Sequence, residues 1–207
     1  TAQAQSGSFK YDGQQHSVSG IKENTFIIDG NTYTLSGLTA EASEKNAGTY
    51  TVNLVGTAVV SDAYGNDVTS QFAVNMVTGE LVITQRQIVF TSADGTKTYD
   101  GTALVNEEVA VGGDGFVNGE GAVFNVTGSQ VIVGSSKNTF TYILNDGTAE
   151  NNYDIQVEYG VLNGIGYINF HEYMYVGICQ DNQINGWGIK AYRGGFQFGI
   201  FEDSELK

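Results

Sequence analysis

Few residues of this chain have the side chains that acid–base catalysis needs. Histidine occurs twice, and His171 is followed by Glu172 and Tyr173, a set that could supply an acid and a base. Neighbouring residues of a β-strand point to opposite faces of a sheet, so these side chains are not expected to act together. The sequence also lacks the motifs of a nucleophile elbow, a P-loop and a zinc protease. We therefore predict no catalytic residue and no enzymatic activity.

Metal and thiol chemistry is equally sparse. Carboxylates and glycines gather in two segments, SDAYGND at 61–67 and GGDGFVNGEG at 112–121, whose oxygens could hold Ca²⁺. Neither segment has the spacing of an EF-hand, so we interpret both as ordinary acidic turns. The single cysteine, Cys179, allows no internal disulfide and no thiolate metal site. We predict no metal and no cofactor.

Aromatic residues and glycines are concentrated after about Gly166, in YMYVGICQDNQINGWGIKAYRGGFQFGIFED. Exposed rings on a hairpin can stack on sugars or dock a partner, whereas buried rings would form the core of a small module. We expect most of these rings to be buried and Trp187, which lies between two glycines, to be accessible. The candidate ligand-binding residues are Trp187, Tyr192, Phe196 and Phe198.

Composition and charge define the class of protein that must position these residues. With 207 residues, 41% apolar and 12% aromatic, the chain has enough apolar material to fold as one large domain or two ordinary ones. Its 28 glycines, among frequent Asn, Asp, Thr and Val, predict strands joined by tight turns. A formal charge of −14 disfavours nucleic acid and anionic membrane surfaces as partners. No apolar run approaches the roughly 18 residues that a membrane span requires.

One motif, Tyr-Asp-Gly, occurs twice, at 11–13 and at 99–101, each time ahead of a strand-rich segment. The closing parts of the two segments align without a gap, with Phe72 opposite Tyr153 and Leu81 opposite Leu162. Asp-Gly pairs suit tight turns because Asp tolerates positive φ and Gly adopts it without steric cost. We interpret the motif as structural, with each Tyr packing its ring at the edge of a core. The motif residues are Tyr11, Asp12, Gly13, Tyr99, Asp100 and Gly101.

The order of motifs in residues 9–86 resembles a family of bacterial surface repeats. The segments that carry the resemblance are YDG, HSV, YTLSGL, AGTYTV, GNDVTSQFAV and GELVIT, in that order. They are similar to the mostly-β, glycine-rich MBG repeats, and the second copy, with KTYDGTAL and NNYDI, is similar to the related YDG repeats. The second copy departs from the pattern, since NTFTY replaces Ala-Gly-Thr-Tyr and the Asp-Val-Thr element is missing. The resemblance, over about 9–165, implies immunoglobulin-like or β-grasp-like modules strung end to end in cell-surface adhesins, usually without catalysis.

Three further resemblances concern single features. Tyr-x-Gly at 175–177, Gly-x-Gly at 186–188 and Phe-Gly at 198–199 resemble a MORN repeat, a stacking β-hairpin unit, although a residue is lacking near Arg193. Lys10 and Asn75 could form an isopeptide bond that resembles those of Gram-positive adhesins, although Asn75 is expected to face solvent. His16 falls where the surface repeats commonly have histidine, which implies a place in a turn or an edge strand.

Together these features predict an all-β protein of two tandem immunoglobulin-like or β-grasp-like sandwich modules followed by a small β-hairpin tail. The expected boundaries are 1–86, 87–165 and 166–207. We expect a structural or adhesive segment of a bacterial cell-surface protein, extracellular and acting as a stalk or an interaction module. Its partners would be a host matrix protein, a polysaccharide or neighbouring repeats of the parent protein. A carbohydrate-binding module of a secreted glycan-degrading system is the alternative, supported by the aromatic tail, and an enzyme comes third.

Overall fold

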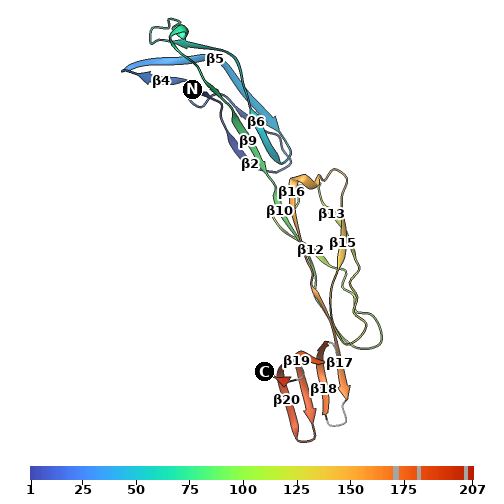
Figure 1. Cartoon of the computed structure of the whole chain (residues 1–207). Coiled ribbons are helices and arrows are strands. Elements are labelled where there is room, and N and C mark those ends of the chain that lie inside the picture. The colour runs from blue at the N-terminus through green and yellow to red at the C-terminus, as the bar shows by residue number, and fades with distance from the viewer. Residues whose placement is uncertain (170–172, 181–182, 203–204) are drawn as a thin grey trace. The chain divides into compact units, whose positions relative to one another are not determined.

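The computed structural model confirms the all-β prediction, with 61% of residues in strands and 3% in helix. It describes residues 1–169, 173–180, 183–202 and 205–207 (Figure 1). Within those ranges the helical segments are two short 3₁₀ turns, η1 (Thr69–Gln71) and η2 (Glu150–Asn152). No helix in this part of the chain has the length and apolar character needed to cross a bilayer.

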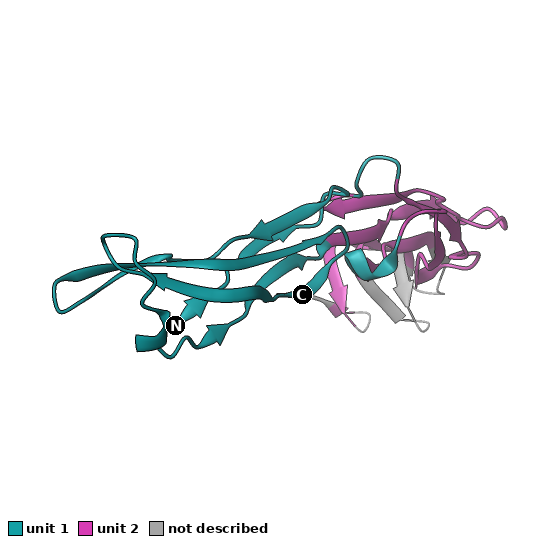
Figure 2. Cartoon of the chain, turned by 90° about the horizontal axis from the view of Figure 1, so that it is seen from above, with its two compact units in different colours: residues 1–86, 116–119, 149–154 teal, residues 87–115, 120–148, 155–207 magenta. Residues whose placement is uncertain are grey.

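The chain divides into two compact units (Figure 2). Unit 1 comprises Thr1–Arg86, Phe116–Gly119 and Ala149–Asp154, and unit 2 comprises Gln87–Gly115, Glu120–Thr148 and Ile155–Lys207. Each unit is described by itself below.

Unit 1 contains three small sheets. Its strands are β1 (Ala2–Gln3), β2 (Gly7–Lys10), β3 (His16–Ser19), β4 (Thr25–Ile28), β5 (Asn31–Glu44), β6 (Gly48–Val52), β7 (Leu54–Ser61), β8 (Met76–Val77) and β9 (Gly79–Thr84). The long strand β5 organises one sheet, because β3, β4 and β7 all pair with it antiparallel. In the second sheet, of order β2-β9-β6, β2 runs parallel to β9. The third is the parallel pair β1–β8.

The core of unit 1 lies against β5. Leu35 and Leu38 are buried on that strand together with Val60 of β7 and Ala2 of β1. Three aromatic rings extend this core, since Phe26, Tyr33 and Phe72 contact one another with centroids 5.0–5.7 Å apart. Phe72 meets the other two rings edge-to-face, whereas Phe26 and Tyr33 are stacked, and such aromatic contacts add to the stabilisation that comes from burial alone.

The remaining strands form three sheets. They are β10 (Arg86–Ser92), β11 (Gly95–Thr98), β12 (Val109–Gly113), β13 (Ala122–Val126), β14 (Gly134–Lys137), β15 (Phe140–Leu144), β16 (Tyr153–Glu158), β17 (Val161–Asn169), β18 (Tyr173–Gln180), β19 (Gln183–Tyr192), β20 (Gly195–Glu202) and β21 (Glu205–Leu206). One sheet has the order β12-β10-β16, and β13 pairs antiparallel with β15 in a two-stranded sheet. The largest sheet has the order β11-β17-β18-β19-β20-β21, with β14 also on β17.

Strand β17 connects the second repeat to the aromatic tail. Its residues 161–165 pair with β11 and β14, and its residues 165–169 pair with β18. The expected boundary between 165 and 166 therefore falls inside one continuous strand. We call β17 to β21 the C-terminal sheet.

The core of unit 2 is aromatic, with one buried amide beside it. Phe90 is fully buried and makes edge-to-face contacts with Phe124 and Tyr142, both at 4.9 Å. The side chain of Asn138, also fully buried, donates hydrogen bonds of 2.9 Å to the carbonyl groups of Ala93 and Asn106. These bonds satisfy two backbone acceptors that would otherwise lose hydration without replacement.

The two copies of the repeat share strand register. The strand that precedes each Tyr-Asp-Gly pairs in parallel with the last strand of its copy, so that Gly7 lies opposite Leu81 and Gly95 opposite Leu162. These are the two leucines that correspond in the sequence alignment. Each 3₁₀ turn also ends immediately before an aligned aromatic residue, Phe72 after η1 and Tyr153 after η2.

Each Tyr-Asp-Gly forms a turn closed by the Asp side chain. The Asp12 carboxylate accepts a 2.8 Å hydrogen bond from the backbone N–H of Gln14, and Asp100 accepts one of 2.9 Å from Thr102. The intervening glycine has φ of +78° at Gly13 and +83° at the second motif. An aspartate that bonds the backbone two residues on, followed by a left-handed glycine, is a stable local turn.

The tyrosines of the two motifs differ. Tyr11 is 2% exposed and packs edge-to-face on Tyr153 at 5.6 Å, as expected for a ring at the edge of a core. Tyr99 is 55% exposed, so the same expectation is wrong for the second motif. The reason is tertiary, because Tyr11 shares its compact unit with residues 149–154, which bring Tyr153 against its ring.

The turn at the second motif should be visible in an acid titration. The pKa of Asp100 is lowered from 3.8 to about 2, chiefly because the backbone N–H of Thr102 donates to its carboxylate, helped by the Thr102 hydroxyl and by Lys97. A lowered pKa means that the charged form is favoured in the folded state. This contribution to stability is complete above pH 3.8 and is lost as the pH falls toward 2.

We expect carboxyl ¹³C NMR to give a midpoint for Asp100 near 2. The Thr102→Ala variant keeps the backbone donor and loses the hydroxyl, so its midpoint should move part of the way back toward 3.8. A midpoint at 3.8 in the parent chain would contradict the turn described here.

Candidate interaction surface

The C-terminal sheet contains a column of glycines. Gly166, Gly177, Gly188 and Gly199 follow one another at intervals of 11 residues. In the antiparallel register each lies directly opposite the next, across β17, β18, β19 and β20 (Figure 1). Residues opposite one another in a sheet share a face, so the column marks one face along four strands.

A buried tyrosine lies over this column. Tyr175 is fully buried, and a β-carbon placed on either Gly177 or Gly188 would come within 2.2 Å of its hydroxyl oxygen. Phe201, 1% exposed, packs edge-to-face against the same ring at 5.5 Å. The glycines therefore leave the space in which the Tyr175 ring lies flat on the sheet.

The opposite face of β18, β19 and β20 is apolar and exposed. In the register, Val176, Ile189 and Phe198 lie side by side across the three strands, and Trp187 lies beside Ile200. We call this surface the aromatic face, and its residues are Met174, Val176, Trp187, Ile189, Phe196, Phe198 and Ile200. The side chains of these seven residues are between 44% and 72% exposed.

The aromatic face is large for a surface left in water. Its side chains present on the order of several hundred Å² of contiguous apolar area, the size of the largest patches found on ordinary monomers. Trp187 and Phe198 form its most prominent pair, with ring centroids 5.5 Å apart and planes tilted by 43°. Aromatic clusters of this kind are enriched where proteins bind partners.

The four candidate ligand-binding residues divide between the two faces. Trp187, Phe196 and Phe198 belong to the aromatic face, whereas Tyr192, 46% exposed, lies opposite Gly195 on the other side of the sheet. Trp187 is accessible, as expected, whereas the expectation that most of the other rings are buried is wrong for Tyr192, Phe196 and Phe198. The space over Gly177 and Gly188 is filled by the ring of Tyr175, against which Phe201 packs.

Sequence reasoning missed the aliphatic part of the aromatic face, formed by Met174, Val176, Ile189 and Ile200. A signal was present, since the glycines at 177, 188 and 199 recur every 11 residues and each has an apolar residue on both sides. In a strand those two neighbours share the face opposite the glycine. The spacing thus predicts one apolar face along successive strands.

The residues considered for catalysis and metal binding have structural contacts where they are described. His16, the first residue of β3, stacks on Phe9 with ring centroids 4.3 Å apart. Its Nε2 lies 2.9 Å from the Asp12 carboxylate. His171 and Glu172 lie outside the described residues, as does the side chain of Cys179. The described part of the chain contains no group of three or more His, Cys, Asp or Glu placed to hold a metal ion.

Carboxylates of both acidic segments accept hydrogen bonds from backbone N–H groups. The Asp62 carboxylate accepts hydrogen bonds from the amide side chain and backbone of Asn66 and from the backbone of Tyr64, which lowers the pKa of Asp62. In the second segment Asp114 accepts a 3.0 Å bond from the backbone N–H of Gln87, which lies 27 positions earlier, so this bond joins the segment to β10. The contacts of Asp62 are those expected of an acidic turn.

The strand register does not bring the isopeptide candidates together. Lys10 lies opposite Thr84 at the end of β9, whereas Asn75 precedes β8. An isopeptide bond needs its two side chains in contact.

Comparison with known proteins adds no relative, since no family model, no curated protein and no solved structure matches this chain.

Proposed function

We propose that this chain is a non-catalytic adhesive segment of a bacterial cell-surface protein, with the aromatic face as its contact surface. The observation that carries the proposal is the exposure of seven apolar side chains on one side of three adjacent strands. Contiguous apolar patches of this size mark sites where proteins associate, because covering them removes apolar area from water.

A protein surface is the first candidate partner. The seven defining side chains carry one hydrogen-bonding group, the indole N–H of Trp187. Sugar recognition needs polar groups to pair with hydroxyls, which this face does not supply, whereas an apolar protein patch needs none. A host matrix protein with exposed apolar side chains therefore fits better than a polysaccharide.

A polysaccharide is the second candidate, and one observation favours it. Trp187 and Phe198 are 59% and 63% exposed and lie 5.5 Å apart, an arrangement on which the apolar faces of sugar rings could stack. On this alternative the chain is a carbohydrate-binding module of a secreted glycan-degrading system.

The cell-surface assignment is supported by the order of motifs in residues 9–165 and by the shared register of the two copies. Repeated modules of this kind act as spacers that project a contact surface, a role in which unit 1 would be a stalk. Extracellular location follows from the same proposal.

The experiment compares binding of three forms of the full chain to an array of extracellular-matrix proteins and glycans. They are the parent chain, the Trp187→Ser/Phe198→Ser variant and the Tyr192→Ser variant. The matched control is Tyr192, an exposed ring of the same sheet that lies on the opposite face.

We expect the parent and Tyr192→Ser chains to bind the same array members, and the double variant to bind them at least about tenfold more weakly. Binding to glycans alone would select the second candidate. Equal binding by all three chains, or silence of the parent chain on the whole array, would count against the aromatic face as an adhesive surface.

A further inference from the structure

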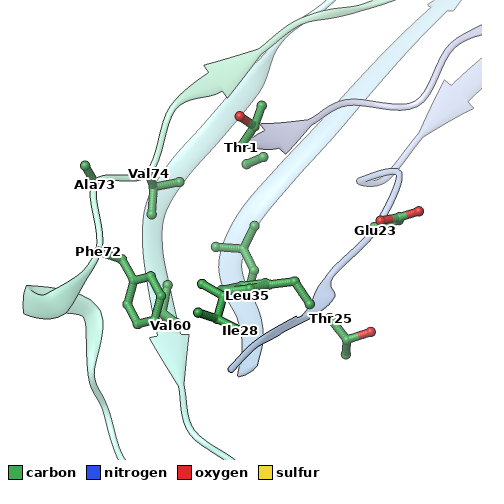
Figure 3. Close-up of a pocket in the computed structure, with 11 residues that line it drawn as sticks. Thr1, Glu23, Thr25, Ile28, Leu35, Val60, Phe72, Ala73 and Val74 are labelled. Carbon is green, nitrogen blue, oxygen red and sulfur yellow. The ribbon is translucent and has the colours of Figure 1, made fainter. Parts of the chain in front are cut away.

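Unit 1 contains a pocket of about 340 Å³ beside its core (Figure 3). Its floor is formed by Leu35 of β5 and Val60 of β7, which are 6% and 1% exposed. Phe72 and Val74 lie on one side, and Ile28 at the end of β4 also lines the pocket. The pocket is therefore an opening into the apolar interior of one compact unit.

Three polar residues, Thr1, Glu23 and Thr25, are among the eleven that line the pocket. Glu23 and Thr25 are exposed and lie on the opposite side from Phe72 and Val74 (Figure 3). The side chains of the other eight lining residues offer aliphatic and aromatic carbon. A largely apolar group is therefore favoured, because polar atoms would lose water against these side chains without finding a partner.

Volume sets the size of the group. An apolar cavity of about 150 Å³ is known to bind benzene. At about 340 Å³ this pocket is roughly twice as large and lies within the range of small-molecule sites, so it suits two fused rings.

Charge at the edge restricts the ligand further. The carboxylate of Glu23 stands at the entrance, and the chain as a whole carries a formal charge of −14. These negative charges disfavour binding of an anionic ligand, whereas a neutral or cationic ligand is not repelled. We propose that this pocket is a binding site for a small molecule that carries a bicyclic aromatic group and no negative charge.

The proposal is tested with indole as a neutral probe and naphthalene-2-carboxylate as an anionic probe of similar size. Binding is followed by methyl NMR, which shows which side chains the probe contacts. Two variants of the full chain provide a matched pair, Ile28→Trp, which fills the pocket, and Ile27→Trp on the adjacent residue, which does not line it. These residues are 46% and 71% exposed, so both variants should fold, which circular dichroism checks.

We expect indole to shift the methyl signals of Leu35, Val60 and Ile28 with a dissociation constant on the order of a millimolar or below. Ile28→Trp should weaken this binding about tenfold or more, whereas Ile27→Trp should leave it within about twofold. The anionic probe should bind more weakly than indole. Indole shifts confined to the aromatic face, or equal affinity for both folded variants, would overturn the proposal.

Discussion

Replacing Gly188 with Ala is expected to destabilise the C-terminal sheet by about 3 kcal/mol. The added methyl carbon would lie 2.2 Å from the hydroxyl oxygen of Tyr175 and 2.5 Å from two of its ring carbons. Because Tyr175 is fully buried against Phe201, its ring cannot move aside without exposing apolar area. The loss of stability is measured by urea unfolding followed by the fluorescence of Trp187, the single tryptophan, which lies on the same strand as Gly188.

Gly194 provides the control for this substitution. A β-carbon there would meet its nearest atoms, in the ring of Tyr192, at 3.9 Å or more, so Gly194→Ala should cost less than about 1 kcal/mol. In the Tyr175→Ala background, Gly188→Ala should cost at least about 1 kcal/mol less than in the parent chain, because the collision is gone. A Gly188→Ala chain as stable as Gly194→Ala would disprove the packing of Tyr175 on the glycine column.

Truncating Tyr11 is expected to have an effect of similar size in unit 1. Tyr11→Ala should lower the free energy of unfolding by about 3–4 kcal/mol, since it removes a buried aromatic ring and leaves a cavity against Tyr153. Trp187 lies outside unit 1, so circular dichroism during urea unfolding is the suitable measurement.

The matched variant is Tyr99→Ala, which changes the same position of the other Tyr-Asp-Gly. Tyr99 is 55% exposed, so this change should cost less than about 1 kcal/mol. Equal losses for the two variants would mean that the rings have the same environment, contrary to the structure.

The contrast between Tyr11 and Tyr99 shows which structural features a short motif can predict and which it cannot. Asp-Gly predicted a turn at both motifs, and both turns form with the same carboxylate contact because that contact spans two residues. Burial of the preceding ring depends on residues more than a hundred positions away, such as Tyr153 for Tyr11, and the motif holds no information about them.

The same limit applies to the candidate surface. The aromatic and glycine content of the tail was sufficient to select Trp187, Phe196 and Phe198, and strand alternation separates them from Tyr192. Which face of the C-terminal sheet is covered depends on the Tyr175 ring, which lies over the glycine column. Tyr175 and Tyr192 are both tyrosines of the glycine-rich tail, and nothing in the sequence distinguishes their burial, yet Tyr175 is fully buried and Tyr192 is 46% exposed.

The most direct test of the aromatic face as contact surface is acrylamide quenching of Trp187 with and without the partner that the array identifies. One tryptophan supplies the whole signal, and it is 59% exposed in the free chain. With the partner at saturation, the quenching constant should fall at least about twofold and the emission should move to shorter wavelength, because covering the face removes water from the indole. An unchanged quenching constant at saturation would place the partner elsewhere and contradict the proposed contact surface.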